Sequence, residues 1–287
     1  MSPTLPGART GTVTTAVALL DDGQEQTMVV GRDGVAQALN LPAGLGRQRT
    51  VQLSPDGSRV AAVGITGFFW RELDGGDWRR VEVPDTVTGE GIELTWLPGS
   101  GSLVLRSHLP GVRIDLETDG QRELPELNGY VAWAADPAGL LTYTPRRGEL
   151  VSQEPDGESR SVIITPLESL QRLIVSATSL AAARANSSIA SPPAVDDRDG
   201  LIALDRDTLA TRGYLPVRDS SSSYVDGGAL SARAWLDDDT VLFSVHPLQA
   251  DEAHLVTWDV ESGELRRVTS WSGTYSASFA TELLREP

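Results

Sequence analysis

The chain has 287 residues, of which 40% are hydrophobic, so it is long enough to bury a substantial core. It has no cysteine, which excludes disulfides, thiolate catalysis and cysteine-based zinc sites. Its 40 acidic and 24 basic residues give a formal net charge of -16, which repels nucleic acid and anionic membrane surfaces.

The sequence contains no stretch that approaches the ~20 apolar residues of a membrane span, so we expect no direct membrane insertion within this chain. The apolar run at 16–20 is also too short for the core of a signal peptide. A complete chain would therefore be cytoplasmic. The turn-rich opening at 1–7 fits equally well an extracytoplasmic domain whose membrane anchor lies upstream, and the oligomeric state stays open too.

A recurring phrase predicts the architecture: an alternating apolar strand, a turn built on Asp or Gly, and a second apolar run. The clearest copy spans 51–63, and the outline returns around Trp96, Trp133 and Trp235. Each copy contains two hairpins, the second of which turns at an Asp-Gly-like pair. These six turns are Asp33-Gly34, Asp74-Gly75, Asp119-Gly120, Asp156-Gly157, Asp207-Thr208 and Ser262-Gly263. Two hairpins in about 40 to 50 residues are typical of a four-stranded propeller blade.

The predicted fold class is an all-β, six-bladed β-propeller that forms a single domain over 1–287. In chain order, its blades span 10–45 with 275–283, 50–86, 91–127, 129–166, 171–218 and 230–272. The first blade has only three N-terminal strands, at 12–20, 27–30 and 35–39. We expect the C-terminal strand, about 275–283, to pair with this three-stranded blade and close the ring, which removes exposed sheet edges.

The local signals conflict in the fifth blade. Thr165 and Glu168 form a capping-box pattern, and apolar residues follow at helical spacing, so a helix over 166–185 is one alternative. The repeat instead requires strands near 173–177 and 180–184, with a turn at Thr178-Ser179 between them. We favour the strands.

Residues for catalysis or metal binding are scarce. His246 and His254 flank Asp251 and Glu252, which could hold a divalent metal but are more simply exposed loop residues. The acidic segment 196–200 has the spacing of a partial calcium loop and lacks the later ligands. No G-x-S-x-G nucleophile turn is present. We therefore predict no catalytic, cofactor-binding or metal-binding residue and no cofactor.

The seven tryptophans fall into two groups. Trp96, Trp133 and Trp235 occupy matching places just before the blade turns, which indicates packing between blades. Others lie in outer or edge positions, where aromatic and arginine side chains serve as anchors for a partner. The candidate partner contacts are Phe69, Trp70, Arg71, Trp78 and Trp271.

Two phrases resemble known propeller repeats. Ser54-Pro55-Asp56-Gly57 is similar to the S-P-D-G hallmark of TolB-like propellers. The segment Trp258-Asp259-Val260-Glu261-Ser262-Gly263-Glu264-Leu265 resembles the W-D-x-x-x-G-E strand and turn of WD-repeat-like propellers. In style the chain is similar to uncharacterised actinobacterial propeller proteins. The resemblance implies a six-bladed scaffold for protein interaction, and it supplies no catalytic residue.

The expected function is therefore a non-catalytic, protein-binding scaffold that uses a rim or a channel mouth. One alternative is a propeller enzyme, hydrolase or lactonase-like, with a channel carboxylate or calcium site. Such an enzyme would place titratable residues from several blades around one cavity, whereas the inward strands here carry mainly Ser, Thr, Ala and Trp. The other alternative is a small-ligand or carbohydrate binder that uses exposed tryptophans.

Overall fold

All regular structure in the described residues is β-strand, apart from three short 3₁₀ helices. The computed structural model describes residues 9–24, 26–89, 91–107, 109–127, 133–135, 141–143, 149–153, 159–163, 168–176, 178–186, 200–208, 210–216, 230–246, 251–273 and 275–285. The chain divides into two compact units, Met1–Gly129 with Thr274–Pro287, and Tyr130–Gly273. In the described part of the chain, no helix is long and apolar enough to cross a membrane.

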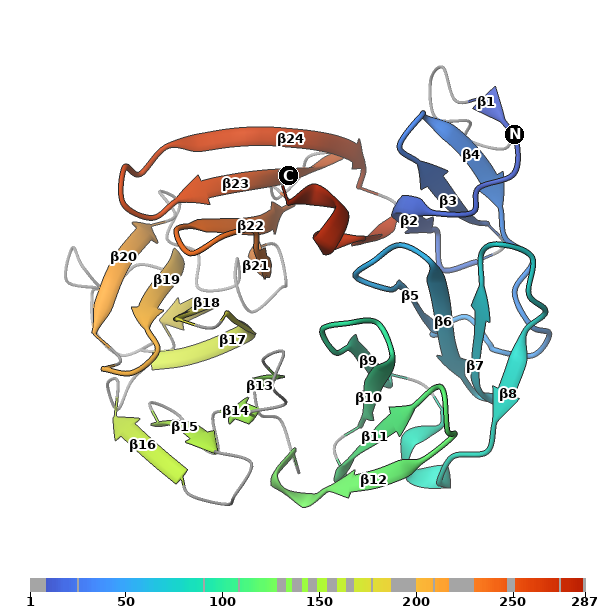
Figure 1. The fold of residues 1–287 in the computed structure, drawn as a ribbon, viewed down its shortest axis with the longest axis horizontal. Coiled ribbons are helices and arrows are strands. Elements are labelled where there is room, and N and C mark those ends of the chain that lie inside the picture. Colours follow the sequence, from blue (N-terminus) through green and yellow to red (C-terminus); the bar gives the residue numbers. More distant parts are fainter. Residues whose placement is uncertain are drawn as a thin grey trace. The chain divides into compact units, whose positions relative to one another are not determined.

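The first unit contains three sheets (Figure 1). One comprises β1 (Arg9–Thr10), β2 (Ala16–Asp21), β3 (Thr27–Gly31), β4 (Val35–Ala38) and β25 (Ser276–Phe279), followed by the 3₁₀ helix η3 (Thr281–Leu284). The second comprises β5 (Thr50–Leu53), β6 (Arg59–Gly64), β7 (Gly67–Glu72) and β8 (Arg79–Val81), followed by η1 (Asp85–Val87). The third comprises β9 (Glu93–Trp96), β10 (Ser102–Arg106), β11 (Gly111–Asp115) and β12 (Gln121–Leu124), followed by η2 (Pro125–Leu127).

The prediction of six blades, with three N-terminal strands in the first, is wrong. The structure has five four-stranded blades, whereas the sheet that holds both ends of the chain has five strands in the order β1-β4-β3-β2-β25. The extra strand, β1, pairs in parallel with β4, Arg9 lying opposite Val35. Because β1 has only two residues, it carries no alternation that could reveal it in the sequence. The expected pairing of the C-terminal strand is present: β25 runs antiparallel to β2, with Phe279 opposite Ala18.

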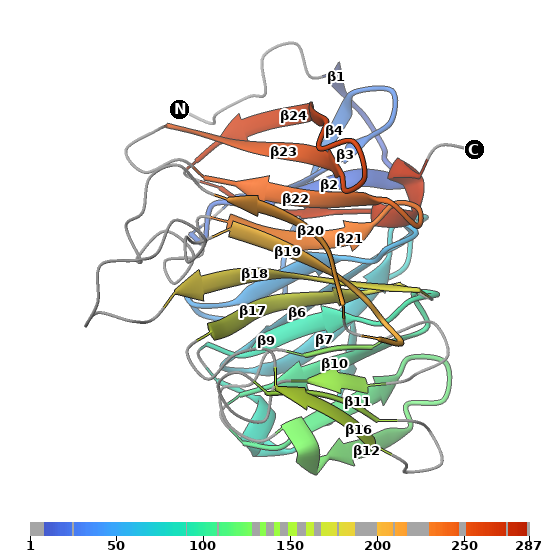
Figure 2. The same ribbon diagram turned by 90° about the vertical axis from the view of Figure 1, so that its left-hand side faces the viewer.

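The second unit contains three blades, each of four antiparallel strands in sequence order. The strands of two of these blades, β17–β20 and β21–β24, can be followed in Figure 2. The first comprises β13 (Trp133–Ala135), β14 (Leu141–Tyr143), β15 (Glu149–Gln153) and β16 (Ser159–Ile163). The next comprises β17 (Glu168–Val175), β18 (Ser179–Asn186), β19 (Gly200–Asp205) and β20 (Thr211–Pro216). The last comprises β21 (Leu230–Trp235), β22 (Thr240–Val245), β23 (Glu252–Asp259) and β24 (Leu265–Ser272).

The segment with conflicting signals forms strands, so the helical alternative is wrong for its described residues. β17 pairs antiparallel with β18, with Val175 opposite Leu180. The register slips between Gln171 and Ile174, which marks a β-bulge. Burial of Leu173 and Leu180 in one apolar cluster outweighs the local helical spacing. Residues 164–167, with the predicted helix start, lie outside the described part of the chain.

The turn of the clearest repeat requires its glycine. Gly57 has φ +73°, a left-handed conformation that a Cβ disfavours. A Cβ there would also lie 2.1 Å from the carbonyl oxygen of Ala16 and 2.9 Å from Leu283. The Gly57 carbonyl in turn accepts a hydrogen bond of 2.8 Å from the Ala16 amide. This turn therefore docks directly on the sheet that contains β2.

Apolar clusters form between neighbouring sheets inside each unit. Trp96 is buried in a cluster that joins the β5–β8 and β9–β12 blades. Trp235 is buried in a cluster that joins the β17–β20 and β21–β24 blades. The predicted packing role of these two residues is confirmed, and Trp133 is buried as well.

Candidate functional site

Four of the five candidate partner contacts lie on or next to β7, but strand alternation divides them between two faces. Phe69 and Arg71 point to one face of the β5–β8 blade and Trp70 points to the other. Phe69 and Trp78 pack against the apolar cluster shared with the β2–β4 sheet. Trp70 belongs to the cluster shared with the β9–β12 blade. The short aromatic run in the sequence is therefore not one continuous patch.

Trp70 lies in the core, with 3% of its surface exposed. Two guanidinium groups cover its ring: Arg79 at 4.8 Å and Arg59 at 5.5 Å from the ring centroid. Its indole N–H is buried and finds no hydrogen-bond acceptor among the described residues. Arg79 is exposed, so this arginine, and not the indole, lies at the surface.

Trp78 is half-buried, and it lies on the other face of the β5–β8 blade from Trp70. Its indole N–H donates a hydrogen bond of 2.8 Å to the carbonyl oxygen of Asn40, and the Arg71 guanidinium lies 5.9 Å from its ring centroid. Arg79 and Arg80 follow directly and are exposed. We refer to Arg71, Trp78, Arg79 and Arg80 as the Arg–Trp edge.

Trp271, the fifth candidate contact, belongs to the second unit. It lies on β24, opposite Ala253 of β23, and only 8% of its surface is exposed. The structure therefore brings together four of the candidate residues on one blade and places Trp271 on another.

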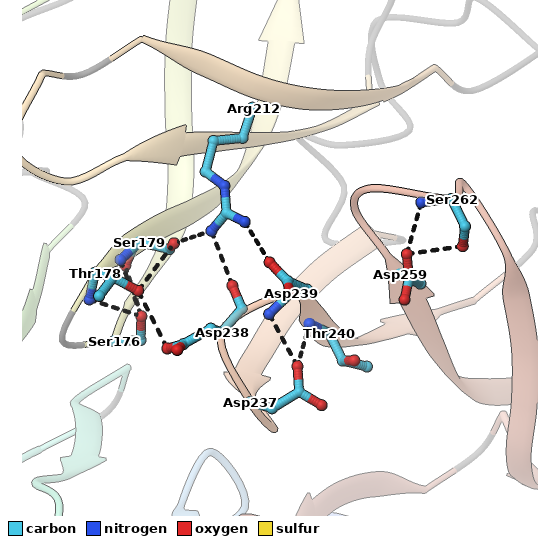
Figure 3. A network of polar contacts seen from close by, with 10 residues as sticks. All are labelled: Ser176, Thr178, Ser179, Arg212, Asp237, Asp238, Asp239, Thr240, Asp259 and Ser262. Carbon is cyan, nitrogen blue, oxygen red and sulfur yellow. Dashed lines mark hydrogen bonds and ion pairs between the residues drawn. The ribbon is translucent and has the colours of Figure 1, made fainter.

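A polar network in the second unit centres on Arg212 (Figure 3). Arg212 is the extra residue where the register of β19 and β20 shifts, and such bulges redirect a side chain. Its guanidinium donates to the hydroxyl of Ser179, to a carboxylate oxygen of Asp239 and, at 2.8 Å, to the carbonyl oxygen of Asp238. The hydroxyl of Thr178 donates to the carboxylate of Asp238 at 3.2 Å.

This network joins the β17–β18 turn and the β21–β22 turn to the outermost strand β20. Within the second turn, a carboxylate oxygen of Asp237 accepts the amide N–H groups of Asp239 at 2.9 Å and Thr240 at 2.7 Å (Figure 3). Residues 237–239 thus lie in the hairpin turn between β21 and β22. Every donor and acceptor named here bonds to another residue of the same unit, so we assign the network a structural role.

A second set of carboxylates stabilises the turns between the third and fourth strands. In Asp259, one oxygen accepts the Ser262 amide and the Ser262 hydroxyl, each at 2.7 Å (Figure 3). Asp115 bonds in the same way to Thr118, and Asp205 to Thr208.

Hydrogen bonds to the ionised form lower the pKa of all three carboxylates. The sequence pattern placed these turns at the later Asp-Gly-like pairs and did not identify the aspartate that caps each turn. A D-x-x-[ST] spacing, which occurs at the same place in three repeats, could have identified these aspartates.

Asp56 caps the turn of the clearest repeat and reaches the next blade. Burial of this carboxyl favours its neutral form, but hydrogen bonds from Ser54, Ser58 and Ser100 outweigh that effect and lower its pKa. The Asp56 amide also donates to the Ser100 hydroxyl at 3.1 Å, and Arg59 donates to the Ser100 carbonyl at 3.0 Å. The S-P-D-G phrase thus joins the β5–β8 blade to the β9–β12 blade.

Among the residues that the structure describes, one ion pair has both side chains buried. Arg49 and Asp21 are 2.8 Å apart, with side chains 7% and 3% exposed. Asp21 also accepts the Thr27 hydroxyl at 2.7 Å, and Arg49 donates to the Gln24 carbonyl at 2.8 Å. Asp21 lies opposite Ser276, so this pair supports the place where the C-terminal strand joins the sheet. No sequence pattern indicated the pair, because its members come from separate elements.

Within the described residues, no group of three or more His, Asp or Glu side chains is placed to hold a metal ion. His254, one of the histidines considered above, has its Nδ1 atom 2.8 Å from the Ser270 hydroxyl. Residues 191–199, which contain most of the partial calcium loop, lie outside the described part of the chain.

No protein-family model and no curated protein sequence matches the chain. Solved structures similar to it are β-propellers. A chain of a nidogen–laminin complex is 11% identical with a TM-score of 0.59, and the match covers 93% of this chain and 98% of that one. A putative TolB from Agrobacterium tumefaciens is 11% identical, with a TM-score of 0.56 and 91% of each chain covered. The β-propeller domain of the trilobed protease from Pyrococcus furiosus is 12% identical, with a TM-score of 0.54 and coverage of 92% and 84%.

These likenesses show the fold, which is a β-propeller with TolB among its structural neighbours. At this level of identity they do not assign a function, because one fold hosts many unrelated activities.

Proposed function

We propose that the chain is a non-catalytic, protein-binding β-propeller and that the Arg–Trp edge is its contact surface. The observation that carries the proposal is the pairing of guanidinium groups with buried or half-buried indoles: Arg79 with Trp70, and Arg71 with Trp78. Arginine and tryptophan are enriched among the residues that dominate binding energy.

The rigidity of this edge supports the proposal. The Trp78 ring is fixed by its hydrogen bond to Asn40, and Trp70 is fixed by its burial, so the arginines that lie on these rings lose little further freedom on binding. Arg79 and Arg80 are exposed and make no ion pair with any described residue, so their charges are available to a partner. Because the whole chain has a net charge of -16, a cationic edge is a local departure from its average surface.

The comparisons add support of a general kind. One structural neighbour comes from a protein–protein complex, the nidogen–laminin complex, so propellers of this size occur in such assemblies. The resemblance of the Ser54–Gly57 turn to TolB-like repeats points in the same direction, since that family suggests a scaffold for protein interaction.

The proposal is tested by quantitative capture with the immobilised chain from an extract of its host cell. We expect specific partners to be lost from the Trp78→Ala/Arg79→Ala variant and retained by the Arg122→Ala variant. Arg122 is a suitable control because it is an exposed arginine on the edge strand of the neighbouring blade. Circular dichroism must show that both variants are folded. Equal capture by the wild-type chain and both variants would contradict the assignment of this edge.

A further inference from the structure

The outermost strand of the last blade, β24, presents an edge that is exposed over residues 265–269. β24 spans Leu265–Ser272, pairs with β23 on one side and ends the order of its sheet among the described strands. Residues 265–269 are all exposed. Leu265 and Val268, with 51% and 43% of their surfaces exposed, are two of the four large hydrophobic residues exposed in the described part of the chain. An edge of this kind offers unpaired backbone N–H and C=O groups to another strand.

The other outer strands differ from β24 in ways that limit access. The edge of β4 is already occupied by β1, which shows that an outer edge in this protein accepts an added strand. β8 has three residues, β12 has four and β16 has five. In β20, the guanidinium of Arg212 is occupied by Asp238 and Asp239 of the same unit.

The charges on β24 determine which kind of strand it would accept. Arg266 and Arg267 are adjacent and exposed, and neither forms an ion pair with a described residue. They lie on opposite faces of the strand, opposite Thr257 and Val256 of β23. A second copy of β24 would bring four arginines together, and like charges on paired strands repel. The same charges attract an added strand that carries carboxylates at the facing positions.

A register shift in β24 also limits which strands can pair with its outer edge. The register shifts between Leu255 and Val256 of β23, which leaves Val268 without a cross-strand partner. Such a bulge bends an edge strand and opposes its indiscriminate pairing. Regular backbone remains on both sides of Val268, at 265–267 and at 269–270.

We infer that the exposed edge of β24, over residues 265–269, binds an extended acidic segment of a partner protein as an added β-strand. The backbone of the added strand would pair with the outer edge, two adjacent acidic residues would face Arg266 and Arg267, and apolar residues beside them would cover Leu265 and Val268. This mode of recognition takes its affinity from main-chain hydrogen bonds and its specificity from alternate side chains. The inference is independent of the Arg–Trp edge.

The test uses the full chain and fluorescence anisotropy of a labelled eight-residue peptide with a central Val-Glu-Glu-Val segment. We expect the Arg266→Glu/Arg267→Glu variant to bind this peptide about tenfold more weakly or worse, and to bind a Val-Lys-Lys-Val peptide better than the wild-type chain does. Arg122→Glu on β12 is the matched control, and it should leave the affinity unchanged. The Trp78→Ala/Arg79→Ala variant should also bind normally, which separates this site from the proposed function.

A second peptide separates strand addition from simple charge attraction. Methylation of alternate backbone nitrogens keeps every side chain but removes the amide donors that an added strand needs, so we expect it to abolish binding. The Arg266→Gln/Arg267→Gln variant serves as the milder substitution if charge reversal impairs folding, as judged by circular dichroism. The inference is overturned if the wild-type chain does not bind the acidic peptide, if charge reversal leaves the affinity unchanged, or if the methylated peptide binds as well as the parent.

Discussion

Substitution of Trp70 by alanine distinguishes a core tryptophan from a contact tryptophan, and Trp78→Ala on the same blade is the matched comparison. Trp70 is 3% exposed and packs in the cluster between two blades, so its removal leaves a large cavity and uncovers two arginines. Removal of a buried large aromatic side chain costs about 3–5 kcal/mol. Trp78 is half-buried, and its replacement by alanine removes one hydrogen bond to Asn40. We therefore expect Trp78→Ala to lower the free energy of unfolding by about 1–2 kcal/mol.

These free energies convert into measurable shifts of the melting temperature. With 287 residues and about 2.1 cal/mol/K per residue, the entropy of unfolding is about 0.6 kcal/mol/K. We therefore expect Trp70→Ala to lower the melting temperature by about 5–8 °C and Trp78→Ala by about 2–3 °C. Far-UV circular dichroism is the suitable probe because tryptophan fluorescence changes with the substitution itself. A smaller loss for Trp70→Ala than for Trp78→Ala would refute the assignment of Trp70 to the core.

Three further predictions concern other parts of the chain. Deletion of residues 273–287 removes β25 and η3 and leaves the edge of β2 unpaired, so the melting temperature should fall sharply; an unchanged transition would contradict the pairing seen here. Gly57→Ala introduces a Cβ 2.1 Å from the Ala16 carbonyl oxygen at a left-handed position, so it should lower the free energy of unfolding measured by urea titration by about 2–4 kcal/mol. A decrease of less than about 0.5 kcal/mol would show that the turn relaxes freely. The amide and hydroxyl of Ser262 lower the pKa of the Asp259 carboxylate, so the stability that this carboxylate contributes is complete above its usual pKa and is lost as the pH falls through the lowered value. Asp259→Asn should therefore reduce the difference in melting temperature between pH 7 and pH 3, and an unaltered difference would argue against the capping role.

The sequence by itself determined the all-β class and most of the hairpins. Strand alternation and Asp-Gly-like turns act within a few residues, so they are legible without knowledge of the fold. The turn at Gly57 and the turn at Gly263, both with positive φ, show this local chemistry in place. The repeat register also resolved the segment around Leu173, where local helical spacing competed with it.

Only the tertiary structure decided which side chains meet. Trp70 is buried because its face of β7 meets the β9–β12 blade, whereas its neighbours Phe69 and Arg71 point the other way. Arg212 bonds to two turns that are distant in sequence, and β1 adds a fifth strand to the closing sheet without any alternation of its own. Contacts of this kind depend on how one sheet packs against another. A periodic pattern in the sequence specifies which residues share a face of a strand, but it does not specify what that face packs against.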